Sequence, residues 1–190
     1  MAGQKVIITG VPGAGKTTVI NASMEKIAAE RIPYQYINFG SFMFEVAVAD
    51  GLIQDRDQMR KLDRTAQKHL QKLIAEKLAA IDGNIIIDTH ASVKTPSGYL
   101  AGLPAWVITT IMPDVIILVE TDNDQILVRR LSDESRVRDV EGAKAIAEHQ
   151  EMNRAFAASC AMLTGCTIKI IVNADSLLDK AVEELTATLR

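Results

Sequence analysis

Gly10-Val11-Pro12-Gly13-Ala14-Gly15-Lys16-Thr17 is the stretch that decides the fold of this 190-residue chain. It fills every fixed position of the pattern G-x-x-x-x-G-K-[ST], the phosphate-binding P-loop. The preceding run, Lys5-Val6-Ile7-Ile8-Thr9, is apolar and β-branched, which is typical of a buried strand. Residues 17–27 follow the spacing of a helix. A strand, a glycine-rich loop and a helix in this order predict an α/β domain that binds a nucleotide.

The residue types in this loop match the chemistry of phosphate binding. Glycines allow the backbone N–H groups to point toward one centre, where phosphate oxygens fit, and the helix start adds partial positive charge. Lys16 can reach the β- and γ-phosphates, and the Thr17 hydroxyl can ligate Mg²⁺. The residues predicted to bind a nucleoside triphosphate are Gly10, Val11, Pro12, Gly13, Ala14, Gly15, Lys16 and Thr17.

Length and composition limit the other possibilities. A chain of 190 residues, 48% apolar and 24% charged, is typical of a single soluble domain. The net charge of −3 favours neither a nucleic-acid nor a membrane partner. No apolar run reaches the roughly 18 residues that span a bilayer, and we expect no signal peptide before the first strand. Cys160 and Cys166 lack metal-ligand spacing, so we expect one cytoplasmic domain over residues 1–190.

Strands and helices alternate along the chain. Apolar runs of the kind found in parallel strands covered on both faces predict further strands at 34–38, 84–89, 114–120 and 167–172. Apolar residues at helical spacing predict helices over 62–81 and from 175 onward, the latter opened by capping side chains at Asp175 and Ser176. The prediction is a three-layer α/β sandwich with a five-stranded parallel sheet flanked by helices. In such sheets ligands bind beyond the carboxyl ends of the strands.

Polar residues are found at those strand ends. Asp88 ends an apolar strand beside the P-loop, which predicts that it holds Mg²⁺ through water. Gly40, just after another strand, would let a small ligand approach the backbone. Phe39 and Met43 are candidate walls for that ligand, although residues 42–44 also fit the core of a helix.

Two clusters of arginine are candidates for the cations that phosphoryl transfer needs. Arg56 and Arg60 are four residues apart and share a helix face. Arg129, Arg136 and Arg138 flank a polar, turn-like segment. Because a closing segment would exclude water from the transfer, we predict a short lid at about 129–140. Isolated arginines are interpreted as solvated surface residues, namely Arg64 and Arg154.

The sequence resembles the archaeal type of adenylate kinase, within the nucleoside monophosphate kinases. The likeness covers almost the whole chain, and the P-loop alone would indicate only an NTPase. The distinctive segments are residues 9–18, 38–40, 55–62, 88–90, 95–104, 136–139 and 163–171.

This resemblance implies reversible, Mg²⁺-dependent transfer between ATP and AMP to give two ADP, and a homotrimer. ATP would lie on the P-loop, including Thr18, and AMP on an insertion at about 39–81. Lys16, Arg129, Arg136 and Arg138 would act on the transferring group. The residues implied at the AMP site are Phe39, Gly40, Ser41, Met43, Arg56, Arg60 and Lys94.

The chain departs from the commoner bacterial pattern on the AMP side. Phe44 and Glu45 stand where that pattern has a phosphate-binding arginine, and the segment 88–94 lacks its Asp-Gly-Phe-Pro-Arg motif. Arg56, Arg60 and Lys94 are the nearest substitutes.

Three alternatives stay open at this point. A kinase for another nucleoside monophosphate would differ by single residues in the loops after the second and third strands. A P-loop ATPase that acts as an assembly factor, of the adenylate-kinase-like nuclear type, predicts slow hydrolysis, but the arginine-bearing lid and the mild acidity count against it. A GTP-binding switch would need an Asn-Lys-x-Asp motif, which the sequence lacks.

Overall fold

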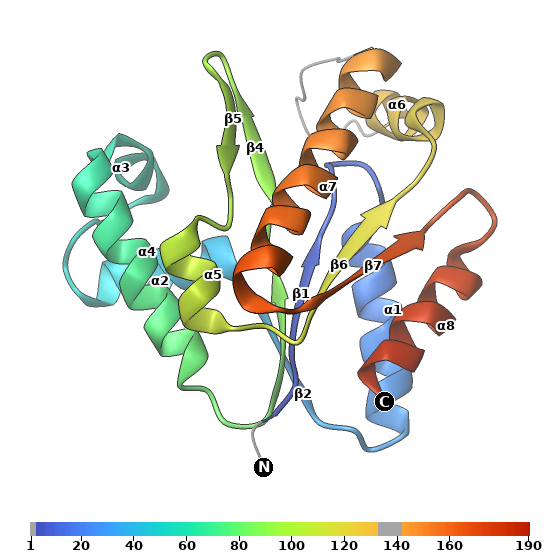
Figure 1. The fold of residues 1–190 in the computed structure, drawn as a ribbon, viewed down its shortest axis with the longest axis horizontal. Helices are drawn as coiled ribbons and strands as arrows, with labels where there is room; N and C mark the ends of the chain where they lie inside the picture. Colours follow the sequence, from blue (N-terminus) through green and yellow to red (C-terminus); the bar gives the residue numbers. More distant parts are fainter. Residues whose placement is uncertain (1–2, 133–141) are drawn as a thin grey trace.

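Five parallel strands form the central sheet, in the order β2-β3-β1-β6-β7 (Figure 1). They are β1 (Lys5–Thr9), β2 (Tyr34–Asn38), β3 (Asn84–Asp88), β6 (Val115–Glu120) and β7 (Thr167–Val172). The structure, a computed structural model, describes residues 3–132 and 142–190. The five predicted strands are therefore confirmed, and their carboxyl ends meet at one edge of the sheet.

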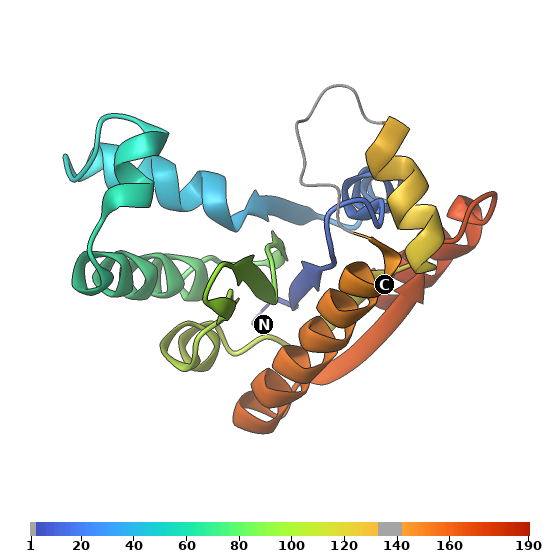
Figure 2. The same ribbon diagram turned by 90° about the horizontal axis from the view of Figure 1, so that it is seen from above.

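Helices cover both faces of the sheet, as Figure 2 shows from above. One face carries α1 (Lys16–Ala29) and α8 (Leu178–Leu189), and the other carries α2 (Phe39–Ala49), α4 (Arg64–Ala79), α5 (Ala105–Ile111) and α7 (Ala143–Thr164). Side chains of β3 alternate between the two layers: Ile85 and Ile87 pack toward α4 and α5, and Ile86 packs toward α1. The predicted three-layer sandwich is confirmed. No helix in the described ranges is long and apolar enough to cross a membrane.

A hairpin beyond the sheet was not predicted from the sequence. Strands β4 (Ser92–Thr95) and β5 (Gly98–Ala101) pair antiparallel and rise past the carboxyl edge of the sheet (Figure 1). Each strand has only four residues, SVKT and GYLA, which is too short for periodicity to give a strand signal. The turn is closed by Gly98, whose φ is +117°, and by the Thr95 hydroxyl, which donates to the Gly98 carbonyl.

Two helix boundaries differ from the prediction. The expected helix over 62–81 starts at Arg64, because Leu62 ends the short helix α3 (Arg56–Lys61). Asp63 caps α4 by accepting from the N–H groups of Thr65 and Ala66. The expected cap at Asp175 was wrong: α8 begins at Leu178 without a side-chain cap, and Asp175 pairs with Arg129 of α6 (Asn123–Ser132) instead.

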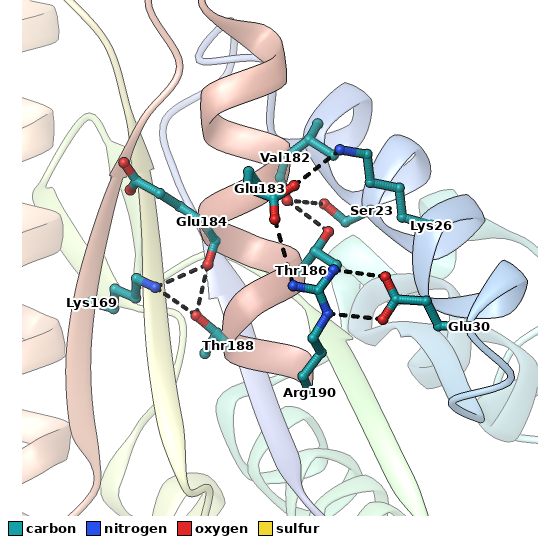
Figure 3. Close-up of polar contacts among 10 residues, drawn as sticks. All are labelled: Ser23, Lys26, Glu30, Lys169, Val182, Glu183, Glu184, Thr186, Thr188 and Arg190. Atoms are coloured by element: carbon teal, nitrogen blue, oxygen red, sulfur yellow. Dashed lines mark hydrogen bonds and ion pairs between the residues drawn. The ribbon is translucent and has the colours of Figure 1, made fainter.

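The last helix is anchored on the P-loop helix (Figure 3). Arg190 of the chain end makes two hydrogen bonds to the Glu30 carboxylate, at 2.8 and 2.7 Å, and Lys26 of α1 pairs with Glu183 of α8. Between these exposed pairs the Ser23 hydroxyl donates to the Val182 carbonyl in the buried interface. These contacts fix α1 against α8, and the N-terminus of α1 lies at the carboxyl edge of the sheet.

Candidate active site

The P-loop forms a tight turn between β1 and α1. Gly13 and Gly15 have φ angles of +95° and +81°, which L-residues rarely adopt, and the Ala14 N–H donates to the Val11 carbonyl at 3.1 Å. At Gly10 a Cβ would lie 2.5 Å from the Val119 carbonyl oxygen, so the loop leaves β1 in close contact with β6. The three glycines are therefore required for the path of the backbone.

Lys16, the first residue of α1, bridges the P-loop and the end of β3. Its ammonium group forms an ion pair with Asp88 and donates to the Thr89 carbonyl at 2.9 Å. Both side chains of the ion pair are largely buried, with 12% and 5% exposed. The lysine and the carboxylate that the sequence singled out are thus brought together.

Strand β2 orients the same carboxylate. Asn38 stands opposite Asp88 in the parallel register, and its amide donates to Asp88 Oδ2 at 3.2 Å. The Tyr36 hydroxyl donates to the same oxygen at 2.8 Å. Burial, and next the hydrogen bond to Asp88, raise the pKa of Tyr36 to about 12, so this phenol stays protonated as a donor. Neither Tyr36 nor Asn38 was predicted as a site residue, although Asn38 belongs to the distinctive segment 38–40 and both lie near the end of a predicted strand.

His90 follows this carboxylate at the start of the loop to β4. Loss of water contact, and then the Lys16 charge, lower the pKa of His90 below its usual value. The ring is therefore neutral at neutral pH. The Ala91 N–H donates to the Thr9 hydroxyl at 2.7 Å, which ties this loop to the end of β1.

Two arginines of α6 contact the outer side of the P-loop. Arg130 Nε donates to the Pro12 carbonyl at 2.8 Å. Arg129 donates to the Ala14 and Asn173 carbonyls, at 3.4 and 3.1 Å, and pairs with Asp175. The sequence placed Arg129 in a lid, whereas the structure places it on a helix that lies against the loop. Arg136 and Arg138, the other predicted lid residues, lie outside the described residues.

The predicted AMP segment opens α2. Asn38 caps this helix by accepting from the Ser41 N–H at 3.0 Å. A Cβ added at Gly40 would lie 3.6 Å from that cap oxygen, which is ordinary van der Waals contact. Phe39 is buried in the core between α2 and α4, so its ring forms no surface of a cleft. Met43 is partly buried against the same core.

The predicted phosphate ligands of AMP come from two other elements. Arg56 and Arg60 lie on α3, and their side chains are outside what the structure describes. Lys94 is exposed on the hairpin as the cross-strand partner of Tyr99. The Tyr99 ring lies 5.3 Å from that of His149 on α7, which attaches the hairpin to this helix.

Glu120, at the end of β6, was missed. Its carboxylate is buried, with 8% exposed, and Arg154 of α7 binds it through Nε at 2.9 and 3.2 Å and through Nη2. The interpretation of Arg154 as a solvated surface residue was therefore incomplete. The available signal was an acidic residue at the end of a buried strand, as at Asp88.

The sequence is similar to curated adenylate kinases over its full length. It is 59% identical to the adenylate kinase of Methanoculleus marisnigri and 53% identical to that of Methanocaldococcus jannaschii, with 100% of each chain covered. The adenylate kinase of Methanopyrus kandleri is 44% identical, with 99% of this chain and 98% of the relative covered.

Two further comparisons concern the domain and the fold. A family model described as an AAA domain matches residues 9–147. The crystal structure of shikimate kinase from Bacteroides thetaiotaomicron aligns with a TM-score of 0.60 at 14% identity and covers 98% of both chains. A likeness at this identity supports the arrangement of the sheet and helices alone.

Proposed function

The chain belongs to the adenylate kinase family, and we propose that it transfers the γ-phosphoryl group of ATP reversibly to AMP, which gives two ADP. The observation that carries this proposal is the end-to-end match to curated adenylate kinases of methanogens. The geometry around Lys16 is consistent with it, because a P-loop lysine and a strand-end carboxylate meet at the carboxyl edge of the sheet.

The reaction needs charge stabilisation and no general base. An oxygen of the AMP phosphate, already anionic, attacks the γ-phosphorus in line, while the bond from that phosphorus to the β–γ bridging oxygen breaks and ADP leaves. The P-loop N–H groups would bind the phosphates of ATP, and we expect Lys16 to exchange Asp88 and Thr89 for the β- and γ-phosphates. Arg136 and Arg138 are proposed to close over the transferring group.

Mg²⁺ is the proposed cofactor. Thr17 is exposed at the start of α1, and the Asp88 carboxylate pairs with Lys16, the residue that precedes Thr17 in the sequence. The Thr17 hydroxyl and the Asp88 carboxylate are hard oxygen donors of the kind that Mg²⁺ prefers, so the residues fit this ion. Thr17 would hold it directly and Asp88 through water, and the bound ion would neutralise charge on the β- and γ-phosphates.

AMP is proposed to bind between α2, α3 and the β4–β5 hairpin. The space at Gly40 supports this location, because the nearest described atom outside the adjoining backbone would lie 3.6 Å from an added Cβ, and Ser41 and Met43 follow on the same helix. Lys94, and Arg56 and Arg60 by family resemblance, are proposed to supply positive charge for its phosphate. Phe39 would contribute only backbone, because its ring is in the core.

The first experiment uses ADP as the sole nucleotide. The purified protein is incubated with Mg²⁺ and ADP, and nucleotides are separated by chromatography. We expect ATP and AMP in equal amounts, and no conversion when EDTA is present. The Lys16→Ala variant, purified in parallel, controls for a contaminating kinase.

Two outcomes would contradict the proposal. Slow phosphate release from ATP without conversion of ADP would indicate an ATPase. Transfer from ATP to CMP or UMP, but not to AMP, would indicate a kinase for another nucleoside monophosphate. Because both readouts use the same preparation, loss of folding cannot explain either result.

We also propose that the enzyme is a cytoplasmic homotrimer. Free Cys160 and Cys166 are compatible with a reducing compartment. The assembly is supported by exposed apolar side chains at the edge of the sheet and the end of α7, namely Ile168, Ile170, Val172, Met162 and Leu163. Patches of this kind are typical of protein–protein interfaces.

Sedimentation equilibrium tests the assembly. We expect a mass of three times 20.7 kDa for the wild-type protein and of one chain for Ile170→Lys. Val48→Lys is the matched control, since Val48 has a similar exposure of 41% on α2, and it should stay trimeric. A wild-type protein that sediments as a monomer or dimer would contradict the proposed trimer.

A further inference from the structure

We propose that Arg129 is a positioning residue, which holds the P-loop in its ATP-binding conformation together with Asn173 and Asp175 of the β7–α8 connection. This inference rests on the proposed function, because it assigns how the ATP side of that site is built. It differs from the role expected from the sequence, in which Arg129 contacts the transferring group.

Among the described residues, the hydrogen bond from the Arg129 side chain to the P-loop goes to a backbone carbonyl, and its other polar contacts are to the β7–α8 connection. Nη1 donates to the Ala14 carbonyl at 3.4 Å, and Nη2 donates to the Asn173 carbonyl at 3.1 Å. Nε donates to Asp175 Oδ1 at 3.0 Å, which adds an ion pair. The guanidinium group thus joins α6, the P-loop and the β7–α8 connection.

Asn173 binds the same P-loop carbonyl. Its side-chain amide donates to the Ala14 oxygen at 2.9 Å, and its own N–H donates to the Glu120 carbonyl at 2.8 Å. The residue is 5% exposed and leaves no space at Gly15, where a Cβ would lie 2.3 Å from Asn173 Nδ2. Two donors from separate elements therefore fix one peptide of the loop.

The direction of these bonds explains the proposed effect. In a phosphate-binding nest the N–H groups point toward the anion, and the carbonyl groups of the same peptides point away. Donors that bind the Ala14 carbonyl from outside therefore orient the N–H groups of the loop toward the phosphates. The guanidinium group spreads its donors over a rigid planar fork, whereas the lysine ammonium is a compact point charge, so we expect lysine to bind these separated acceptors poorly.

The test separates positioning from charge. We expect Arg129→Lys to weaken binding of ATP about tenfold in isothermal titration calorimetry without metal, the scale of one lost hydrogen bond to a charged group. Asp175→Asn, which leaves Arg129 in place, should raise the Kd for ATP in the same direction. The KM for AMP should stay unchanged in both variants.

A direct catalytic role for Arg129 predicts a different pattern. Lysine would keep the charge and most of the kcat, ATP binding would be unaffected, and Asp175→Asn would free the arginine and leave activity intact or higher. That pattern would overturn the proposal. Arg190→Lys is the matched control, because Arg190 also binds a carboxylate through two donors, Nε and Nη2, far from the P-loop (Figure 3). It should leave the Kd for ATP unchanged.

A double-mutant cycle completes the test. If the two residues act as one cluster, the Arg129→Lys/Asp175→Asn protein should bind ATP no more weakly than Arg129→Lys alone. Additive losses would contradict a shared role. Conversion of ADP by the wild-type protein is measured separately and tests the proposed reaction alone. The ATP affinities of the variants test the positioning role of Arg129, so either proposal can fail without the other.

Discussion

Lys16→Ala should reduce kcat by about 10³- to 10⁵-fold, the effect of charge-stabilising groups in phosphoryl transfer. Lys16 supplies the side-chain cation that the structure places between the P-loop and Asp88. Without Lys16, only the N–H dipoles of the P-loop would remain in this part of the site to stabilise the charge that develops on the γ-phosphoryl oxygens. Initial rates of ADP conversion measure the loss, and thermal unfolding shows whether the variant remains folded.

Lys26→Ala is the control for this substitution. Lys26 lies on the same helix and also pairs with a carboxylate, Glu183, but the pair is exposed on the face against α8. Its removal should leave kcat within twofold, as expected for a surface pair worth about 0–1 kcal/mol. A Lys16→Ala protein that keeps more than a tenth of the wild-type kcat would contradict the proposed role of the P-loop lysine.

Gly15→Ala should abolish measurable ATP binding and lower the melting temperature. At φ +81° an alanine is strained by about 1–2 kcal/mol, and its Cβ would lie 2.3 Å from the Asn173 amide that fixes the loop. Either the loop or Asn173 must then move, and the N–H groups lose their common centre. Calorimetric titration with ATP and a thermal unfolding scan measure the two effects.

Gly83→Ala separates the strain from the displacement of the loop. Gly83 has a similar φ of +85°, but a Cβ added there would meet no described atom within 4 Å. This variant should therefore lose a comparable amount of stability and still bind ATP like the wild type. If both variants bind ATP normally, the close packing of Asn173 against Gly15 has no part in nucleotide binding.

The parts of the fold that were predicted correctly depend on local sequence. The P-loop pattern and the apolar runs of the strands are contained in short windows, and burial on both faces makes those runs continuous. Asp88 was predicted as a site residue for the same reason, because a carboxylate at the end of an apolar strand in a P-loop protein can be recognised without knowledge of residues distant in the sequence.

The features that were missed depend on pairs distant in the sequence. Arg129 and Asp175 are 46 residues apart, and Arg154 and Glu120 are 34 apart, so no periodicity relates them. Aspartate is a residue type preferred at helix N-caps, which led to the prediction at Asp175. In the structure Asp175 pairs with Arg129 of α6 instead, and α8 has no side-chain cap. The hairpin was not predicted for a different reason, since its strands have only four residues each and show no clear alternation.

The packing of α8 on α1 has a consequence for biosynthesis. The bonds from Arg190 to Glu30 join residues 160 positions apart, so the helix that follows the P-loop is covered by α8 only after α8 has been synthesised and has left the ribosome. Contacts this distant in sequence slow folding, because a long loop must close before they form. Until then the apolar face of α1 is open to water and to other nascent chains. The packing of the P-loop helix is therefore complete only after α8 has been synthesised.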